Sequence, residues 1–213
     1  MKNRILNYIF CGIFMLIILG CGRSTDKKNE SGNKNHKDIS KETTQNRYIK
    51  DSLALALCQI YGLDQGIRRS PGFENKMLLV RNVDTFNFKR IVNFIKDNGM
   101  PNEELLGKSN YSQECVKAAF GAVMLHNPHM LVNDEKNFNF FVNLVNEGQL
   151  QSQYLALILD KYYWAKSSGN SVLYGSQFGK PCLNNKKETN KARKEIGLPP
   201  LKDAEFKNCN SNN

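Results

Sequence analysis

Apolar residues recur three and four positions apart in five stretches of this chain. Such spacing places the apolar side chains on one face of an α-helix. The stretches cover about residues 48–67, 84–98, 112–126, 134–147 and 151–166, and a short sixth helix is expected from Lys187 to Ile196. Glycine or proline follows most of them, as is typical of helix ends. The pattern therefore predicts a mainly α-helical, single compact domain of about five to six helices.

Asp84, Ser112 and Asp134 stand just before three of these apolar stretches. Side chains of these types cap helix N-termini, so we expect them to start the second, third and fourth helices. The character of the sequence changes at residues 171–179, where β-branched and aromatic residues are mixed with glycines. This composition predicts an extended loop or a short strand lying across the bundle.

Cys21 is typical of a bacterial lipoprotein signal. It follows a basic start, an apolar stretch from Ile9 to Leu19, and the small residue Gly20. The apolar stretch is about half the length of a bilayer-spanning helix, which indicates a cleaved signal peptide. The lipobox resemblance implies cleavage after Gly20, a diacylglyceryl group on Cys21 and a further acyl chain such as palmitate, which together give a stable membrane anchor.

The predicted organisation follows from this signal. Residues 1–20 form the signal peptide, and 21–47 comprise the lipidated cysteine and a polar tether that we expect to be disordered, because it has too few apolar residues to offset its ordering entropy. The helical domain covers 48–208, and 209–213 form a tail. This order predicts a membrane-anchored lipoprotein of the bacterial cell envelope, with its domain outside the cytoplasm.

The net charge of +10 has an uneven distribution. Residues 1–50 contain 10 basic and 4 acidic residues, a net charge of +6, and the remaining residues contribute only +4. The one dense basic run, residues 186–194, lacks the interleaved aromatic residues of a platform for stacking bases. We therefore expect no nucleic-acid partner, and we expect contact with the membrane only through the anchor.

Asp64, Gln65, Arg68 and His126 form the first set of candidate ligand-binding residues. Asp64 and Arg68 are four apart, so they share a helix face and can pair. A general base at His126 needs a carboxylate to orient its ring, and Asp160 is the first candidate for that role, with Asp64 second. His126 and His129 have metal-ligand spacing, but Pro128 breaks the helix between them. The sequence thus predicts no metal and no cofactor.

Tyr174, Ser176 and Gln177 form the second set. They surround Gly175, whose conformational freedom can direct their polar groups toward one point. Either a ligand-facing loop or a structural corner accounts for this pattern. Ser176 does not stand in the G-x-S-x-G pattern of a nucleophile elbow, so it is not predicted to be a nucleophile.

Four further cysteines follow the lipidated one and allow three complete pairings. Cys58 and Cys115 lie in apolar helical stretches and are expected as small buried residues. Cys182 and Cys209 lie in C-terminal loop sequence, where a disulfide is expected in an oxidising compartment.

Several short motifs together resemble a bacterial family of unknown function, over about Leu53 to Phe206. The motifs are Asp64-Gln65 with Arg68, Gly99-Met100-Pro101, Leu106-Gly107, His126, Leu155-Ala156 with Asp160-Lys161, Tyr174-Gly175-Ser176-Gln177, and Arg193 before Gly197-Leu198. This chain departs from the family at Met100, Asn127-Pro128 and Lys161, where tryptophan, a small-acidic pair and arginine are usual. The resemblance implies a fold and a set of polar positions that includes Arg193, but no activity.

Two functions are compatible with these observations. The first is a binding or interaction module of the cell envelope that captures a small polar ligand or a protein partner. The second is an envelope enzyme, such as a hydrolase, that uses His126 with Asp160 or Asp64 and the loop from Tyr174 to Gln177. The absence of a catalytic motif in the sequence favours the first.

Overall fold

The structure, a computed structural model, describes the backbone of residues 34–209 and the side chains from residue 43 onward. The chain divides into two units, Met1–Ser40 and Lys41–Asn213. Only the beginning of the first helix is described in the first unit, so the folded domain is the second unit. The predicted signal peptide, Cys21, the tether up to residue 33 and the last four residues of the tail lie outside the described residues.

Helices dominate residues 34–209, which contain no β-strand. A mainly helical fold is therefore confirmed, whereas the expected number of helices was too low and the possible strand at 171–179 is an irregular loop. The α-helices are α1 (Lys34–Arg69), α2 (Lys76–Asn98), α3 (Glu103–Leu106), α4 (Lys108–Tyr111), α5 (Glu114–His126), α6 (His129–Val132), α7 (Glu135–Asn146), α8 (Ser152–Lys166) and α9 (Lys186–Glu195), with 3-10 turns η1 (Leu183–Asn185) and η2 (Asp203–Glu205).

The first two helices are longer than expected. Helix α1 begins at Lys34, so residues 34–47 of the predicted disordered tether are helical. Helix α2 begins at Lys76, which places Asp84 inside the helix rather than at its N-cap. The carboxylate of Asp84 instead binds Arg68 of α1. An internal ion pair thus uses the side chain that was expected to cap a helix.

Two four-residue helices, α3 and α4, connect α2 with α5 and were not predicted. Asn102 caps α3 by accepting a hydrogen bond from the Leu105 amide at 2.8 Å. Ser112, expected to cap α5, lies at the C-terminal end of α4. Helices of one turn are too short to show an apolar periodicity, so these two left no helical pattern in the sequence.

The later helices agree with the sequence. Asp134 caps α7, accepting hydrogen bonds from the Lys136 and Asn137 amides. Helices α8 and α9 begin and end within a residue of the expected positions. The strongly amphipathic or apolar stretches thus located the longer helices of the C-terminal half.

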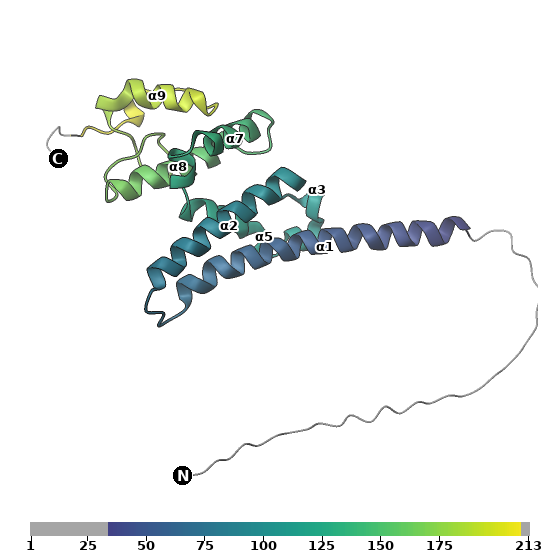
Figure 1. The fold of residues 1–213 in the computed structure, drawn as a ribbon. Helices are drawn as coiled ribbons and strands as arrows, with labels where there is room; N and C mark the ends of the chain where they lie inside the picture. The colour runs from purple at the N-terminus through teal and green to yellow at the C-terminus, as the bar shows by residue number, and fades with distance from the viewer. Residues whose placement is uncertain (1–33, 210–213) are drawn as a thin grey trace, which may run out of the picture. The chain divides into compact units, whose positions relative to one another are not determined.

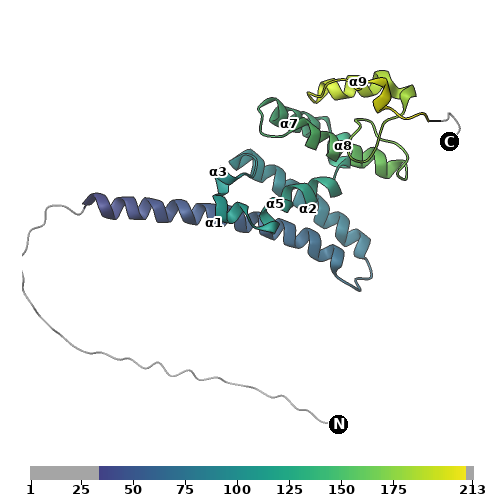
Figure 2. The same ribbon diagram turned by 180° about the vertical axis from the view of Figure 1, so that it is seen from behind.

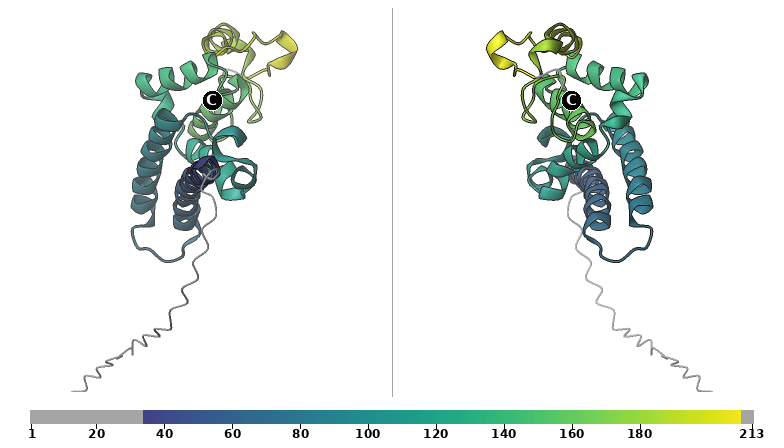
Figure 3. Two further views of the ribbon diagram at one scale, coloured as in Figure 1. Left: turned by 90° about the vertical axis from the view of Figure 1, so that its right-hand side faces the viewer. Right: turned by 90° about the vertical axis from the view of Figure 1, so that its left-hand side faces the viewer.

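Helices α1 and α2 form an antiparallel hairpin whose two members stand side by side when seen end-on (Figures 1 and 3). The amide of Asn87 joins them inside the hairpin by donating to the Ile60 carbonyl at 3.0 Å. Helix α5 packs against α2 and also against α8, while α6 and α7 pack against α8. Helix α9 lies at the opposite end of this unit from the hairpin turn (Figure 2).

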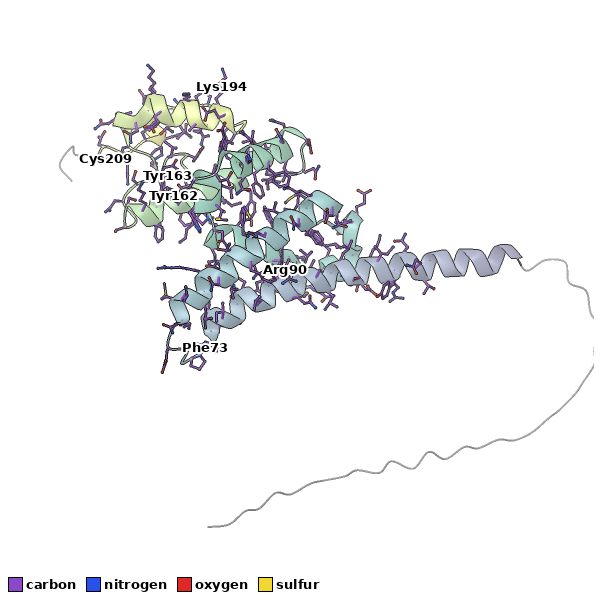
Figure 4. All side chains as sticks on the ribbon, viewed as in Figure 1. Phe73, Arg90, Tyr162, Tyr163, Lys194 and Cys209 are labelled. Carbon is purple, nitrogen blue, oxygen red and sulfur yellow. A yellow bond between two sulfur atoms is a disulfide. The ribbon has the colours of Figure 1, made fainter. Side chains whose placement is uncertain are left out.

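One continuous apolar core lies between these helices, and side chains fill the spaces between the ribbons (Figure 4). Most of its largest fully buried members come from α1, α2, α5, α7 and α8. They include Leu57, Ile60, Ile91, Met124, Phe141, Leu155 and Ile158. Phe73 lies in the turn of the α1–α2 hairpin and is about half exposed. Within the described part of the chain, no helix has the combined length and apolarity to cross a membrane.

Two disulfides join distant parts of the domain. Cys182 and Cys209 are bonded, as the sequence led us to expect, and connect the segment before η1 with the C-terminal end. Cys58 and Cys115 are also bonded, rather than being separate buried thiols, and fasten α1 to α5. Their separation of 57 residues hid this contact from a prediction based on local sequence.

Candidate functional site

The first group of predicted residues meets around the carboxylate of Asp64, which is fully buried. Its Oδ1 atom lies 3.0 Å from Nδ1 of His126 and 3.0 Å from a terminal nitrogen of Arg68. The amide of Gln65 donates to the second oxygen at 2.8 Å. Helices α1 and α5 thus bring together four residues that the sequence had selected, and Asp64, not Asp160, is the partner of His126.

Asp84 completes this group, which we call the Asp64 cluster: Asp64, Gln65, Arg68, Asp84 and His126. Arg68 donates to Asp84 at 2.5 Å through its other terminal nitrogen, so its guanidinium group bridges two carboxylates. The role of Asp84 was missed from the sequence because this residue was assigned to a helix cap. The signal that could have indicated this role is an acidic residue within an apolar helical stretch.

Electrostatics favour the ionised form of Asp64. Burial alone would raise the pKa of this carboxyl, but the hydrogen bond and charge of His126, followed by Arg68 and Gln65, outweigh burial and lower it. Hydrogen bonds and opposite charges stabilise a carboxylate in this way. The cluster is therefore a network of ion pairs that joins α1, α2 and α5.

Ligand atoms of Asp64, Asp84 and His126 lie within 4.8 Å of one another, a separation compatible with a bound metal ion. The guanidinium group of Arg68, however, already contacts both carboxylates. An internal cation therefore occupies the position between the two carboxylates and offsets one of their two negative charges. We interpret the group as an ion-pair network rather than a metal site.

The second group is organised by Asp160, a fully buried residue of α8. Its Oδ1 atom accepts hydrogen bonds from the amides of Leu173 and Tyr174 at 2.8 and 2.7 Å, and Oδ2 accepts one from Ser176 at 2.8 Å. Burial raises the pKa of Asp160, although these backbone hydrogen bonds act against the shift. Asp160 therefore positions the loop at 171–179 and does not orient His126.

The turn at Gly175 separates the side chains of this loop. Gly175 has a φ of +74°, in the left-handed region that favours glycine. Tyr174 is buried and lines a hollow on one side, together with Leu131 and Tyr163, and burial raises the pKa of its hydroxyl. Ser176 and Gln177 line a different hollow. The loop thus presents two of its three polar side chains at one place, not all three as the sequence suggested.

Arg193 of α9 holds the other side of this loop. Its Nη1 atom donates to the Tyr174 carbonyl at 2.5 Å, and its Nε atom donates to the Pro199 carbonyl at 2.8 Å. The residue is only 8% exposed and borders the same hollow as Ser176 and Gln177. Three motif pieces of the sequence, around Asp160, Ser176 and Arg193, therefore meet at one location.

Two hollows share part of their lining, and we call them together the amide groove. One has a volume of about 730 Å³ and the other about 480 Å³, and both are lined by Gln151 and Tyr154. Side-chain amides are frequent along the groove: Asn98, Asn102, Gln149, Gln151, Gln153 and Gln177. Lys117 and Arg193 are its charged residues, and none of its described lining residues carries a carboxylate.

Tyr154 and Gly121 determine the shape of the groove, and neither was selected from the sequence. The Tyr154 hydroxyl lies so near α5 that a Cβ atom added to Gly121 would be 2.3 Å from it. A glycine within an apolar helix is the signal that could have indicated this close approach.

Helix α5 separates the two groups. Cys115 and His126 are eleven residues apart, about three turns, and both contact α1. Lys117 and Gly121 lie on the opposite side of the helix, where they face the groove and Tyr154. The described side chains therefore do not combine His126 with the loop at 171–179 in one site.

No protein-family model, curated protein or solved structure matches this chain. The similarity to a bacterial family of unknown function stays a prediction based on the short motifs between Leu53 and Phe206.

Proposed function

We propose that this protein is a cell-envelope lipoprotein, anchored through Cys21, whose helical domain is a non-catalytic binding module for a hydroxyl-rich ligand. The ligand class that suits the amide groove is an oligosaccharide. The observation that carries this proposal is the concentration of side-chain amides in two hollows that share Gln151 and Tyr154.

Amide side chains suit hydroxyl groups because each amide has both a donor and an acceptor, as each hydroxyl has. Gln151, Gln153 and Gln177 are exposed and line the smaller hollow. Tyr111 and Tyr154 provide aromatic surface in the larger one. A sugar ring has polar edges and apolar faces, so this combination can bind both.

The size of the groove favours an extended ligand. Each hollow falls in the range of about 300–1,000 Å³ that small-molecule sites occupy. Because Gln151 and Tyr154 border both, a chain of sugar rings can occupy the two hollows in succession. An extended peptide commonly binds by adding a strand to a sheet edge, and the described residues contain no strand to which it could pair.

Envelope enzyme activity at His126 is the second candidate. Nδ1 of His126 contacts the buried Asp64 carboxylate, and its side chain is 33% exposed. A histidine held in this way can serve as a general base through its other ring nitrogen. The loop from Tyr174 to Gln177 does not contribute to such a site, since its hydrogen bonds go to Asp160 and Arg193 and none goes to a described residue of the Asp64 cluster. This separation favours binding over catalysis.

Binding of the full-length chain, purified in detergent, to an array of neutral and acidic oligosaccharides tests the proposal. The discriminating variant is Gly121→Ala, whose added methyl group would lie 2.3 Å from the Tyr154 hydroxyl, so this side chain of the groove must shift. We expect it to weaken saccharide binding by about tenfold, the equivalent of losing one or two hydrogen bonds.

Gly66→Ala is the matched control, because it also replaces a helical glycine but its new methyl group meets nothing within 4 Å. It should bind as the unaltered chain does. The proposal is wrong if no oligosaccharide binds, or if both alanine variants bind equally well.

A further inference from the structure

Arg193 is a buried cation that forms no ion pair with the side chains that the structure describes. The ion pairs of the described residues include Arg68, His126, Lys186 and Lys191, but no carboxylate lies within 4.0 Å of Arg193. Both of its hydrogen bonds go to backbone carbonyls. A buried charge is costly without an opposite charge. Burial lowers the pKa of the Arg193 guanidinium, and the more distant carboxylates of Glu205 and Asp160 oppose that shift without contacting it.

The guanidinium group still has donors to offer. It carries five N–H groups, and the bonds to Tyr174 and Pro199 use two of them. Its Nη2 atom makes no hydrogen bond within residues 43–209, and it is not among the fully buried polar atoms without a partner, so solvent reaches it. Arg193 lines the smaller hollow of the groove, where a ligand would lie.

The two existing hydrogen bonds keep the group in place. They fix the guanidinium plane between the loop and the segment after α9, so little further conformational freedom is lost when a ligand binds. Arginine also stays protonated at every physiological pH. The hollow therefore contains a fixed positive charge before any ligand arrives.

We propose that Arg193 binds a carboxylate group on the saccharide ligand, so that the amide groove selects acidic over neutral oligosaccharides. This inference rests on the proposed function and adds the chemical identity of the ligand. A carboxylate is preferred to a phosphate because Arg193 is the one charged residue among the described residues that line this hollow. One positive charge matches the single negative charge of a carboxylate.

Gln177 is placed to assist. It is exposed, lines the same hollow and has no hydrogen-bond partner among the described residues. Its amide can therefore donate to the second oxygen of a carboxylate whose first oxygen contacts Arg193. A hydrogen bond to a charged acceptor is stronger than one to a neutral acceptor, which accounts for the selection of the acid over the neutral form.

The test compares uronate-containing oligosaccharides with the same compounds after methyl esterification of their carboxyl groups. Calorimetric titration of the full-length chain in detergent should show the acid binding at least about tenfold more tightly than the ester. Gln177→Glu places a negative charge beside Arg193 at an exposed position, where folding should be unaffected. It should weaken binding of the acid much more than binding of the ester, which has no negative charge for the new carboxylate to repel.

Arg193→Gln provides a second variant, with thermal unfolding as its control because this residue also supports the loop. If it folds, it should bind acid and ester equally. Equal binding of acid and ester by the unaltered chain would overturn the role of Arg193 while leaving the groove proposal intact. Failure of both forms to bind would refute the groove proposal and this inference together.

Discussion

The Asp64 cluster and the amide groove contain buried charges that are balanced in different ways. In the cluster, the carboxylates of Asp64 and Asp84 meet the side chains of Arg68 and His126. Beside the groove, the carboxylate of Asp160 meets three backbone amides, and Arg193 meets two backbone carbonyls. The charged side chains of the cluster therefore contact one another, whereas the guanidinium group of Arg193 beside the groove contacts no carboxylate.

This difference separates stability from binding. Side-chain ion pairs across α1, α2 and α5 hold helices together and use the polar groups of the participants. The backbone contacts of Asp160 and Arg193 determine the shape of the loop at 171–179. They leave the side-chain amides of the groove lining exposed. We therefore expect changes in the cluster to alter the free energy of unfolding, and changes in the groove lining to alter ligand binding.

Removal of the disulfides should have the largest effect on stability. The Cys58→Ala, Cys115→Ala double variant opens a loop of 57 residues, and a chain-entropy estimate gives a loss of about 4 kcal/mol. The Cys182→Ala, Cys209→Ala double variant opens 27 residues and should lose about 3.5 kcal/mol. Urea unfolding measures both. A loss far greater for the second pair would show that the groove end, not the hairpin end, depends more on its crosslink.

Asp160→Ala should cost about 3 kcal/mol, because it leaves the amides of Leu173, Tyr174 and Ser176 without an acceptor in a buried position. Asp97→Ala, at an exposed position of α2, is the control and should change the unfolding free energy by less than about 0.5 kcal/mol. Equal stability of the two variants would show that Asp160 does not hold the loop.

Asp64→Asn should cost about 2 kcal/mol at pH 7, since it removes a charged hydrogen-bond partner of His126 and Arg68. The folded-state pKa of Asp64 lies below its ordinary value of 3.8. Its stabilising contribution is therefore complete above pH 3.8 and is lost as the pH falls through the lower folded value.

Urea unfolding of the unaltered chain and of the Asp64→Asn variant, from acidic to neutral pH, measures this contribution. The quantity of interest is the difference between their free energies of unfolding at each pH. The raised pKa of Asp160 has the opposite effect on stability, but it is common to both proteins and cancels. A difference that does not shrink at low pH would contradict an ionised Asp64.

Gln151→Ala should have the smallest effect on stability, less than about 0.5 kcal/mol, because the residue is exposed. Since Gln151 lines both hollows, its loss should nevertheless weaken saccharide binding. Thermal unfolding and titration on the same sample measure the two effects. A destabilised variant with unchanged binding would reverse the division of roles proposed for the two regions.

Much of the helical fold could be predicted from the sequence, because amphipathic spacing and caps such as Asp134 are local signals. The pairing of Asp64 with Arg68 was also local, at four residues' separation. Asp64 was only the second candidate partner of His126 and the Cys58–Cys115 disulfide was not predicted, because both contacts depend on how α1 packs against α5. The roles of Asp84 and Asp160 were likewise misassigned, because the spacing of residues in the sequence does not show which side chain or loop they contact across helices.

The location of the bound ligand tests the central claim most directly. Side-chain NMR of the full-length chain, titrated with an acidic oligosaccharide, can follow the glutamine amides, the Arg193 Nε–H and the His126 ring together. We predict shifts at Gln151, Gln177 and Arg193, with the His126 resonances unchanged. Shifts at His126 with an unaltered groove would contradict the account and place the function of this protein at the Asp64 cluster.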